Sequence, residues 1–280
     1  MRIIIFLFLI LYVSFIANAQ RKHAVELIYS HTNLGLNRTE EERKLHYNGL
    51  HESSEIVADS ILSIFNQNFC SKQTINLLGL RIVSSIPLDS QQIYVINYSI
   101  GGGVHKANLQ HIISETNVLG YQNFDVSAFV NANINFTYKV KNRFYLQPLI
   151  EFWHFRGKAN SVTDLVYSYD HPSFDEQHDN KYKLSILKGA INVGYELREW
   201  NFKVGPAYSF IETTYNIRRT ITDLDWDETT EEIIEYKYNN AYPLSFDLAC
   251  SYNFTPNLSL TVSGNFNKYI STQTFLSFKF

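Results

Sequence analysis

The chain has 280 residues, of which 45% are hydrophobic and 15% aromatic, and its formal net charge is −3 at pH 7. A mildly acidic chain offers no basic field to DNA or RNA, so no nucleic-acid partner is expected. This hydrophobic content is ordinary for a soluble protein, and it equally fits a membrane β-barrel, in which only every second strand residue faces lipid. The aromatic excess, 19 Tyr and 20 Phe against one Met, favours strands.

Residues 1–19 have the pattern of a removable signal peptide. Arg2 precedes the apolar run 3–16, and residues 17–19 read Ala-Asn-Ala, a cleavage motif. The apolar run is shorter than the roughly 18 residues of a membrane-spanning helix. We therefore expect export. If the mature chain crosses a membrane, it must do so as a closed barrel, the other backbone arrangement that satisfies its polar groups in lipid.

Residues 20–90 allow two interpretations. Apolar spacing predicts a helix over 51–66, and the flanking segments 24–31 and 74–86 both have strand character. In the first interpretation, 20–90 is a short, partly helical periplasmic segment or plug that precedes the barrel. In the second, both flanking segments are barrel strands and the helix lies in an outer loop. We favour the first, which leaves eight barrel strands; the second gives ten, and both numbers are even, as in bacterial barrels.

The clearest predicted strand covers 123–140. Apolar residues occupy every second position from Phe124 to Val140, with mostly polar residues such as Asn131 between them. Period two over this length excludes a helix and exceeds the ~9–11 residues that a tilted strand needs to cross a membrane. The same alternation predicts strands at 94–100, 144–152, 187–197, 202–210, 242–252, 258–266 and 272–280.

Short and long connections alternate between these strands. The links at 141–143, 199–200 and 255–257 are tight polar turns, whereas those at 105–121, 157–181 and 219–240 are long. Outer-membrane barrels have short periplasmic turns and long extracellular loops. Residues 91–280 are therefore predicted to form an all-β, closed antiparallel transmembrane barrel, with both chain ends on the periplasmic side.

The alternating strands, the cleavage motif at 17–19, the terminal aromatic Phe280 and the Asn- and Tyr-rich composition support a family resemblance. The chain resembles the outer-membrane β-barrel proteins that are abundant in Bacteroidetes, over about 91–280 and by pattern rather than by a signature motif. The resemblance implies a Gram-negative outer-membrane location and the barrel fold. It transfers no functional residue, because that group is functionally diverse.

Histidines gather in the predicted outer loops, near potential nucleophiles and acids. The residues concerned are His105, His111, His154, His171, His178, Ser161, Asp164, Asp170 and Asp175. Outer-membrane acyltransferases, deacylases and proteases place His with such residues at the outer rim, where a base activates a nucleophile or water. The spacing matches none of their signatures. We interpret these residues as polar loop residues and keep a lipid- or peptide-modifying hydrolase as the alternative.

Other polar groups also receive structural interpretations. The predicted lumen holds Lys139, Glu151, Lys188, Lys203 and Asp247, which we expect to pair with one another in a filled interior; a proton or ion path is the alternative. Cys70 and Cys250 could pair after export. Because Cys250 is in register with the lipid face, we favour two free thiols.

Two short motifs lack the residues that their chemistry requires. Residues 223–227 read Asp-x-Asp-x-Asp, the start of a calcium loop, but Glu228 and Ile234 occupy the positions of the glycine and the closing glutamate. The triplet Gly101–Gly103 has no following helix to bind phosphate, so we interpret it as a bend. We predict no cofactor, metal or catalytic residues.

We therefore predict an integral outer-membrane barrel without catalytic activity, whose extracellular loops bind a surface ligand or partner. The alternatives are the hydrolase, with a His-containing site at the outer rim, and a small diffusion pore, which requires a lumen wider than eight strands provide. The expected partners are outer-membrane lipid, the barrel assembly machinery and an unidentified surface ligand or protein.

Overall fold

The structure is a computed structural model. It describes residues 22–48, 70–114, 117–141, 143–159, 163–164, 174–223 and 228–280. The predicted signal peptide and the predicted helix over 51–66 lie outside these residues.

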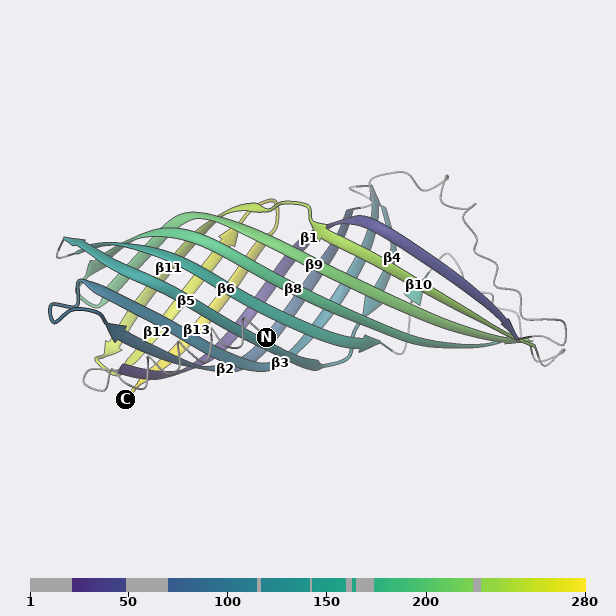
Figure 1. Ribbon diagram of the computed structural model, residues 1–280, viewed down its shortest axis with the longest axis horizontal. Helices are drawn as coiled ribbons and strands as arrows, with labels where there is room; N and C mark the ends of the chain where they lie inside the picture. The colour runs from purple at the N-terminus through teal and green to yellow at the C-terminus, as the bar shows by residue number, and fades with distance from the viewer. Residues whose placement is uncertain are drawn as a thin grey trace.

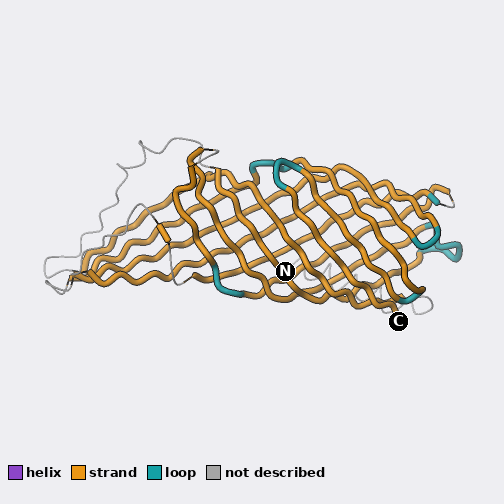
Figure 2. The backbone as a smooth tube through the Cα atoms, turned by 180° about the vertical axis from the view of Figure 1, so that it is seen from behind, coloured by secondary structure: helices purple, strands orange, loops and turns teal. Residues whose placement is uncertain are grey.

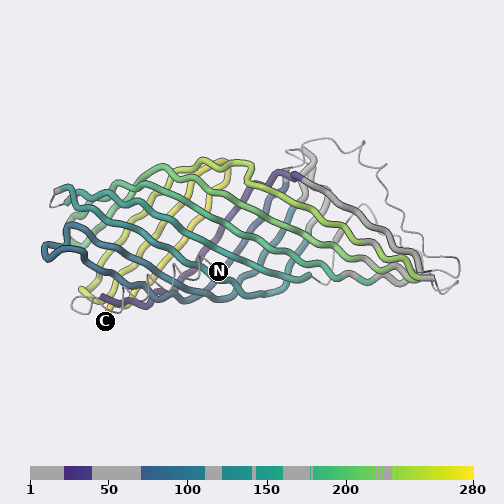
Figure 3. The backbone as a smooth tube through the Cα atoms, in the orientation of Figure 1, coloured from purple at the N-terminus to yellow at the C-terminus, as the bar shows by residue number. Residues whose placement is uncertain are grey.

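Within the described residues, ten long strands form a closed antiparallel barrel (Figure 1). They are β1 (Lys22–Asn48), β2 (Cys70–Pro87), β3 (Tyr94–Ser114), β5 (Ser127–Lys141), β6 (Phe144–Ala159), β8 (Phe174–Leu197), β9 (Trp200–Asp223), β11 (Leu244–Thr255), β12 (Leu258–Phe266) and β13 (Ile270–Lys279). Each pairs with the next, and β13 pairs with β1 from Ala24↔Lys279 to His31↔Thr272, which closes the ring. Figure 3 shows the purple first strand beside the yellow last strands.

Three shorter strands add to the wall. β4 (Asn117–Asn123) pairs with β3, and β7 (Thr163–Asp164) pairs with β4. β10 (Glu228–Asn240) lies between β9 and β1 and is followed, after residues 241–243, by β11, which also pairs with β9. β10 and β11 therefore act as one interrupted strand.

The prediction of eight strands with a separate, partly helical N-terminal segment is wrong. β2 pairs with β3 from Cys70↔Ile112 to Pro87↔Val95, so the described parts of 20–90 are barrel wall. The reason is that β2 is apolar on both faces: Leu77 is buried inside, whereas Leu78 is exposed outside, which obscures the two-residue period. The described residues contain no helix that is long and apolar enough to cross a membrane.

The two faces of the wall differ as the alternation predicts. On β5, Val130 is 53% exposed on the outside, whereas Asn131 is 1% exposed on the inside. Exposed apolar side chains continue around the barrel at the same level, including Leu80, Ile150 and Phe246. We refer to this outer belt as the apolar band. A belt of this kind faces lipid in transmembrane barrels.

The two ends of the barrel differ in the length of their connections. At the turn end, the described residues 88–93, 143, 198–199 and 256–257 lie between neighbouring strands, and Phe280 lies at the same end (Figure 2). Arg198 has a φ of 51° in its two-residue hairpin, a left-handed conformation that such tight turns require. The opposite end is the loop end.

Most of the predicted outer loops are strand instead. The pairing of β8 with β9 extends from Leu197↔Trp200 at the turn end to Phe174↔Asp223 at the other end. β10 pairs with β1 from Leu36↔Asn240 to Asn48↔Thr229. A 24-residue strand is about 80 Å long at ~3.3 Å per residue, more than a bilayer requires. Residues 36–48, 174–183, 214–223 and 228–240 form this projection, which we name the extension (Figure 1).

Arginine substitutions along the outside of one strand should measure the depth of the apolar band. Ile134 lies at its middle, Val130 nearer the loop end and Val126 beyond β5, with exposures of 38%, 53% and 65%. Arg costs ~2–4 kcal/mol at the bilayer midplane and ~0–1 near the interfaces. Reversible unfolding in lipid vesicles should therefore rank the losses Ile134→Arg, then Val130→Arg, then Val126→Arg. Equal losses would contradict a lipid-facing band.

Candidate functional site

The lumen near the turn end is polar and contains paired charges. Arg81 Nε lies 2.5 Å from Glu26 Oε2, and Lys188 Nζ lies 2.7 Å from Asp247 Oδ2. Asn265 Nδ2 donates a further hydrogen bond of 2.7 Å to Asp247 Oδ1. Buried charges need such partners to remain ionised. The lumen at this level thus contains ion pairs between neighbouring or nearby strands of the wall.

The predicted lumen charges are only partly brought together. Lys188 and Asp247 pair as expected and Glu151 is buried, but Lys139 lies 3.9 Å from the Oε2 of Glu196 near the turn end. Lys203 lies on β9, opposite Gly194 on β8 and Ala249 on β11. The Glu26–Arg81 pair was missed because its strands were assigned outside the barrel. In both segments a charged residue lies between apolar neighbours, Glu26 between Val25 and Leu27 and Arg81 between Leu80 and Ile82. This alternation could have identified the two segments as barrel strands.

Aromatic rings fill the lumen near the loop end. The rings at this end that are at most 4% exposed come from β3, β5, β6, β8, β9, β10 and the segment before β5. We name them the aromatic layer: His105, Phe124, Phe129, Trp153, Phe155, Tyr182, Tyr215 and Tyr238. Phe124 and Tyr182 centroids are 4.4 Å apart, and Tyr182 continues to Tyr215 at 5.8 Å. Gly157 is required opposite Tyr182, since a Cβ there would lie 2.1 Å from the ring.

A cavity of about 70 Å³ lies between the polar lumen and the aromatic layer. Glu151 and Lys188 line it on one side and Trp153 and Phe155 on the other. A space of this size holds a few waters. On its loop-end side, the lumen is filled by the buried rings of the aromatic layer.

The two predicted histidines whose side chains are described lie on opposite faces of the wall. His105 is inside, with its Nε2 hydrogen-bonded to the Tyr182 hydroxyl. His154 is outside on β6, with its Nδ1 3.0 Å from Ser185 Oγ. The predicted companions are not described at side-chain level: Ser161, Asp170 and His171 lie outside the described residues, as do the side chains of His111, Asp164, Asp175 and His178.

The contact between His154 and Ser185 is not arranged as a base and a nucleophile. Arg156 Nε donates to His154 Nε2 at 3.1 Å, so the ring proton is on Nδ1 and points towards Ser185. A base must instead present a lone pair to the hydroxyl, with its other nitrogen oriented by an acid. Among the described residues, no carboxylate takes that position. His154 and Ser185 are therefore not placed as base and nucleophile.

The glycine triplet, the cysteines and the acidic motif form no binding site among the residues that the structure describes. Gly101–Gly103 lie inside β3 without positive φ, so the predicted bend is wrong; a Cβ at Gly103 would lie 2.2 Å from Leu78 O. Cys250 is a free thiol. The described residues contain no group of three or more His, Cys, Asp and Glu that could hold a metal, and residues 224–227 of the acidic motif lie outside them.

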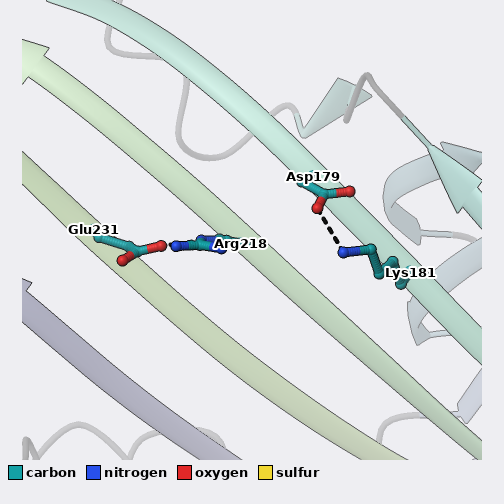
Figure 4. A network of polar contacts seen from close by, with 4 residues as sticks. All are labelled: Asp179, Lys181, Arg218 and Glu231. Carbon is teal, nitrogen blue, oxygen red and sulfur yellow. Dashed lines mark hydrogen bonds and ion pairs between the residues drawn. The ribbon is translucent and has the colours of Figure 1, made fainter.

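The outside of the extension is charged (Figure 4). Lys181 Nζ lies 2.6 Å from Asp179 Oδ2 on β8, and Arg218 on β9 pairs with Glu231 on β10. The hydrogen bond from Lys181 lowers the pKa of Asp179. Exposed pairs contribute at most about 1 kcal/mol each. Their significance is that this surface suits water rather than lipid.

Comparisons with known proteins add no functional assignment. No protein-family model matches the chain, and no curated protein matches it. Similar solved structures include the translocator domain of the autotransporter NalP from Neisseria meningitidis, with 7% identity, a TM-score of 0.41 and coverage of 94% of this chain and 89% of that chain. The toluene transporter TodX from Pseudomonas putida has 10% identity, a TM-score of 0.35 and coverage of 94% and 90%. At these scores the similarities carry no argument.

The structure itself identifies the class of protein. The chain has the architecture of an outer-membrane β-barrel: an even number of antiparallel strands, a closed ring and an apolar outer band.

The Lys188–Asp247 pair should behave as a coupled buried pair. Its side chains are 16% and 14% exposed, and removing one partner of a buried pair costs about 3–5 kcal/mol because the other charge is left unpaired. We expect Lys188→Met and Asp247→Asn each to reduce the free energy of unfolding by an amount near the low end of that range. The double variant should lose clearly less than the sum of the two. Additive losses would show that the pair is not coupled.

Proposed function

We propose that the protein is an integral outer-membrane β-barrel without catalytic activity, which holds its extension outside the cell for binding a surface ligand or partner. The observation that carries this proposal is that buried aromatic rings fill the lumen near the loop end while the wall continues well beyond the apolar band. A lumen filled by side chains favours an anchor over a passage. A long polar projection favours contact with something outside the membrane.

The packing inside the extension supports a binding role. One cluster of buried hydrophobic residues includes Leu36 on β1, Tyr215 on β9 and Tyr238 on β10. The rings of Tyr215 and Tyr238 meet edge to face, with their centroids 5.4 Å apart. Side chains packed in this way keep strands in a fixed arrangement. The extension therefore presents its outer charges, such as Asp179 and Arg218, on a shaped surface rather than on separate loops.

The ends of the chain support the same orientation. Lys22, the first described residue, and Phe280 both lie at the turn end, where the amide of Phe280 donates to His23 O at 3.0 Å. Short turns face the periplasm in outer-membrane barrels. The proposal includes recognition of β13 by the barrel assembly machinery and membership of the Bacteroidetes-type barrel proteins, both supported by the alternation of apolar residues such as Leu276 and Phe278 along β13.

Thiol labelling of intact Gram-negative cells tests the orientation. In a Cys70→Ser/Cys250→Ser background, Gln177→Cys places a thiol at an exposed position of the extension, and Ser90→Cys places one in a turn at the other end. A membrane-impermeant maleimide should label Gln177→Cys in intact cells and Ser90→Cys only after the outer membrane is permeabilised. The reverse pattern would invert the barrel and remove the basis for a surface-binding role.

Conductance in planar bilayers separates the anchor from the diffusion pore. The purified protein should produce no ion-conducting steps, because the aromatic layer closes the lumen. As a matched pair, Trp153→Ala/Phe155→Ala removes two rings from the layer, whereas Phe144→Ala/Phe152→Ala removes two rings from the outside of the same strand. We expect any conductance to appear in the first variant only. Stable steps in the unmodified protein would favour a pore.

A further inference from the structure

The outer faces of β6 and β8 form a ladder of side-chain pairs that changes character towards the loop end. In register, the outward pairs are Phe152↔Leu187, His154↔Ser185, Arg156↔Lys183 and Lys158↔Lys181. The first pair belongs to the apolar band, the second is polar, and the last two are entirely basic. Successive pairs are about 6.6 Å apart along the strands. The wall thus passes from apolar to basic within three steps.

The basic pairs are unfavourable in the protein alone. Side chains directly opposite one another on neighbouring strands have Cβ atoms roughly 5 Å apart, and like charges at that distance destabilise a sheet. Lys181 is paired with Asp179. Within the described part of the chain, Arg156, Lys158 and Lys183 make no ion pair with a carboxylate. The four basic side chains share one carboxylate, Asp179, which pairs with Lys181 and also attracts Lys158. The site therefore keeps a net positive charge that an anion would stabilise.

Carboxylates near this surface do not neutralise it. Glu212 on β9 is opposite Ser185, one step nearer the apolar band than Lys183. Asp125 is exposed, and its backbone amide donates to Lys158 O at 2.7 Å. Neither carboxylate forms an ion pair with Lys158 or Lys183 among the described contacts. Arg156 uses its Nε on His154, which leaves its two terminal amino groups for an external acceptor.

The apolar band below this site lacks a side chain at one position. Gly189 faces outward between Ile150 on β6 and Tyr208 on β9, both exposed. A Cβ built on Gly189 would meet nothing within 4 Å, so the outer surface is open there. This position lies one residue pair below Phe152 and Leu187. Apolar space and basic side chains therefore follow one another along β8 in the order of a lipid's tail and head group.

We propose that this face of β6 and β8 binds a phosphate-bearing lipid of the outer leaflet. Arg156 and Lys183 donate to the phosphate oxygens, Ser185 and His154 contribute polar contacts on the side towards the membrane, and an acyl chain packs beside Gly189. A guanidinium with an ammonium opposite it provides charge-assisted hydrogen bonds to phosphate. A lipid is favoured over a free anion because the basic pairs are continuous with the lipid-facing band.

The inference rests on the membrane placement proposed above but not on the identity of any surface partner. It is tested with full-length protein in detergent micelles, by native mass spectrometry with dioleoyl phosphatidic acid, dioleoylglycerol and inorganic phosphate as separate probes. The folded protein should retain phosphatidic acid and neither of the other two. Arg156→Gln/Lys183→Gln should weaken retention roughly tenfold or more, because each basic side chain near a lipid phosphate adds several-fold.

The control removes the same charge from the other end of the barrel. Lys22→Gln/Lys279→Gln should retain phosphatidic acid as the unmodified protein does. Equal weakening in both double variants, or retention of inorganic phosphate as strong as that of the lipid, would overturn the proposal.

Thermal unfolding provides a second readout that separates lost binding from lost folding. Without lipid, Arg156→Gln/Lys183→Gln should unfold at the same or a higher temperature than the unmodified protein, because the variant no longer has a like-charged pair. Phosphatidic acid should raise the unfolding temperature of the unmodified protein and leave that of the variant unchanged. A variant that is less stable without lipid, or that is stabilised equally by it, would show that the pair serves the fold and not a lipid.

Discussion

Closure of the hydrogen-bonded ring is the constraint on which the rest of this structure depends. Backbone N–H and C=O groups that face lipid must be satisfied within the protein, because the hydrocarbon offers no partner. The pairing of β13 with β1 removes the last free strand edge. Because β1 pairs with β13 on one side and with β2 on the other, both strands belong to the barrel wall and not to a plug. The barrel therefore has ten strands, and this number sets the width of its lumen.

A ten-stranded lumen must be filled, and the protein fills it in two ways. Near the turn end it uses ion pairs such as Glu26–Arg81 and Lys188–Asp247, with amide hydrogen bonds beside them. Near the loop end it uses the aromatic layer. The polar part is held together by paired charges, whereas the aromatic part is held together by contacts between rings. The interior is thus packed in the way that the core of a soluble protein is packed.

The outside of the wall follows a different order. An apolar band is succeeded by basic pairs on β6 and β8 and then by the ion-paired surface of the extension. These three zones correspond to hydrocarbon, head groups and water. The strands continue through all three without a turn, because antiparallel pairing satisfies the backbone equally in each environment. Only the side chains differ from one zone to the next.

Local alternation was enough to identify strands, since a side chain on a pleated strand faces one side or the other with period two, and the phase at Val130 and Asn131 follows from it directly. Alternation failed where both faces are apolar, as at Leu77 and Leu78, because a filled lumen selects the same residues as lipid does. It also could not show that His105 faces inward to Tyr182 while His154 faces outward to Ser185. The basic ladder was equally hidden, because Arg156 and Lys183 are 27 positions apart in the chain and meet only through the register of β6 and β8. The sequence by itself thus determined the membrane-level strands between residues 94 and 280. The strand number, the place of β1 and β2 in the wall and the pairing of β13 with β1 were decided by ring closure, a long-range condition that no local pattern contains.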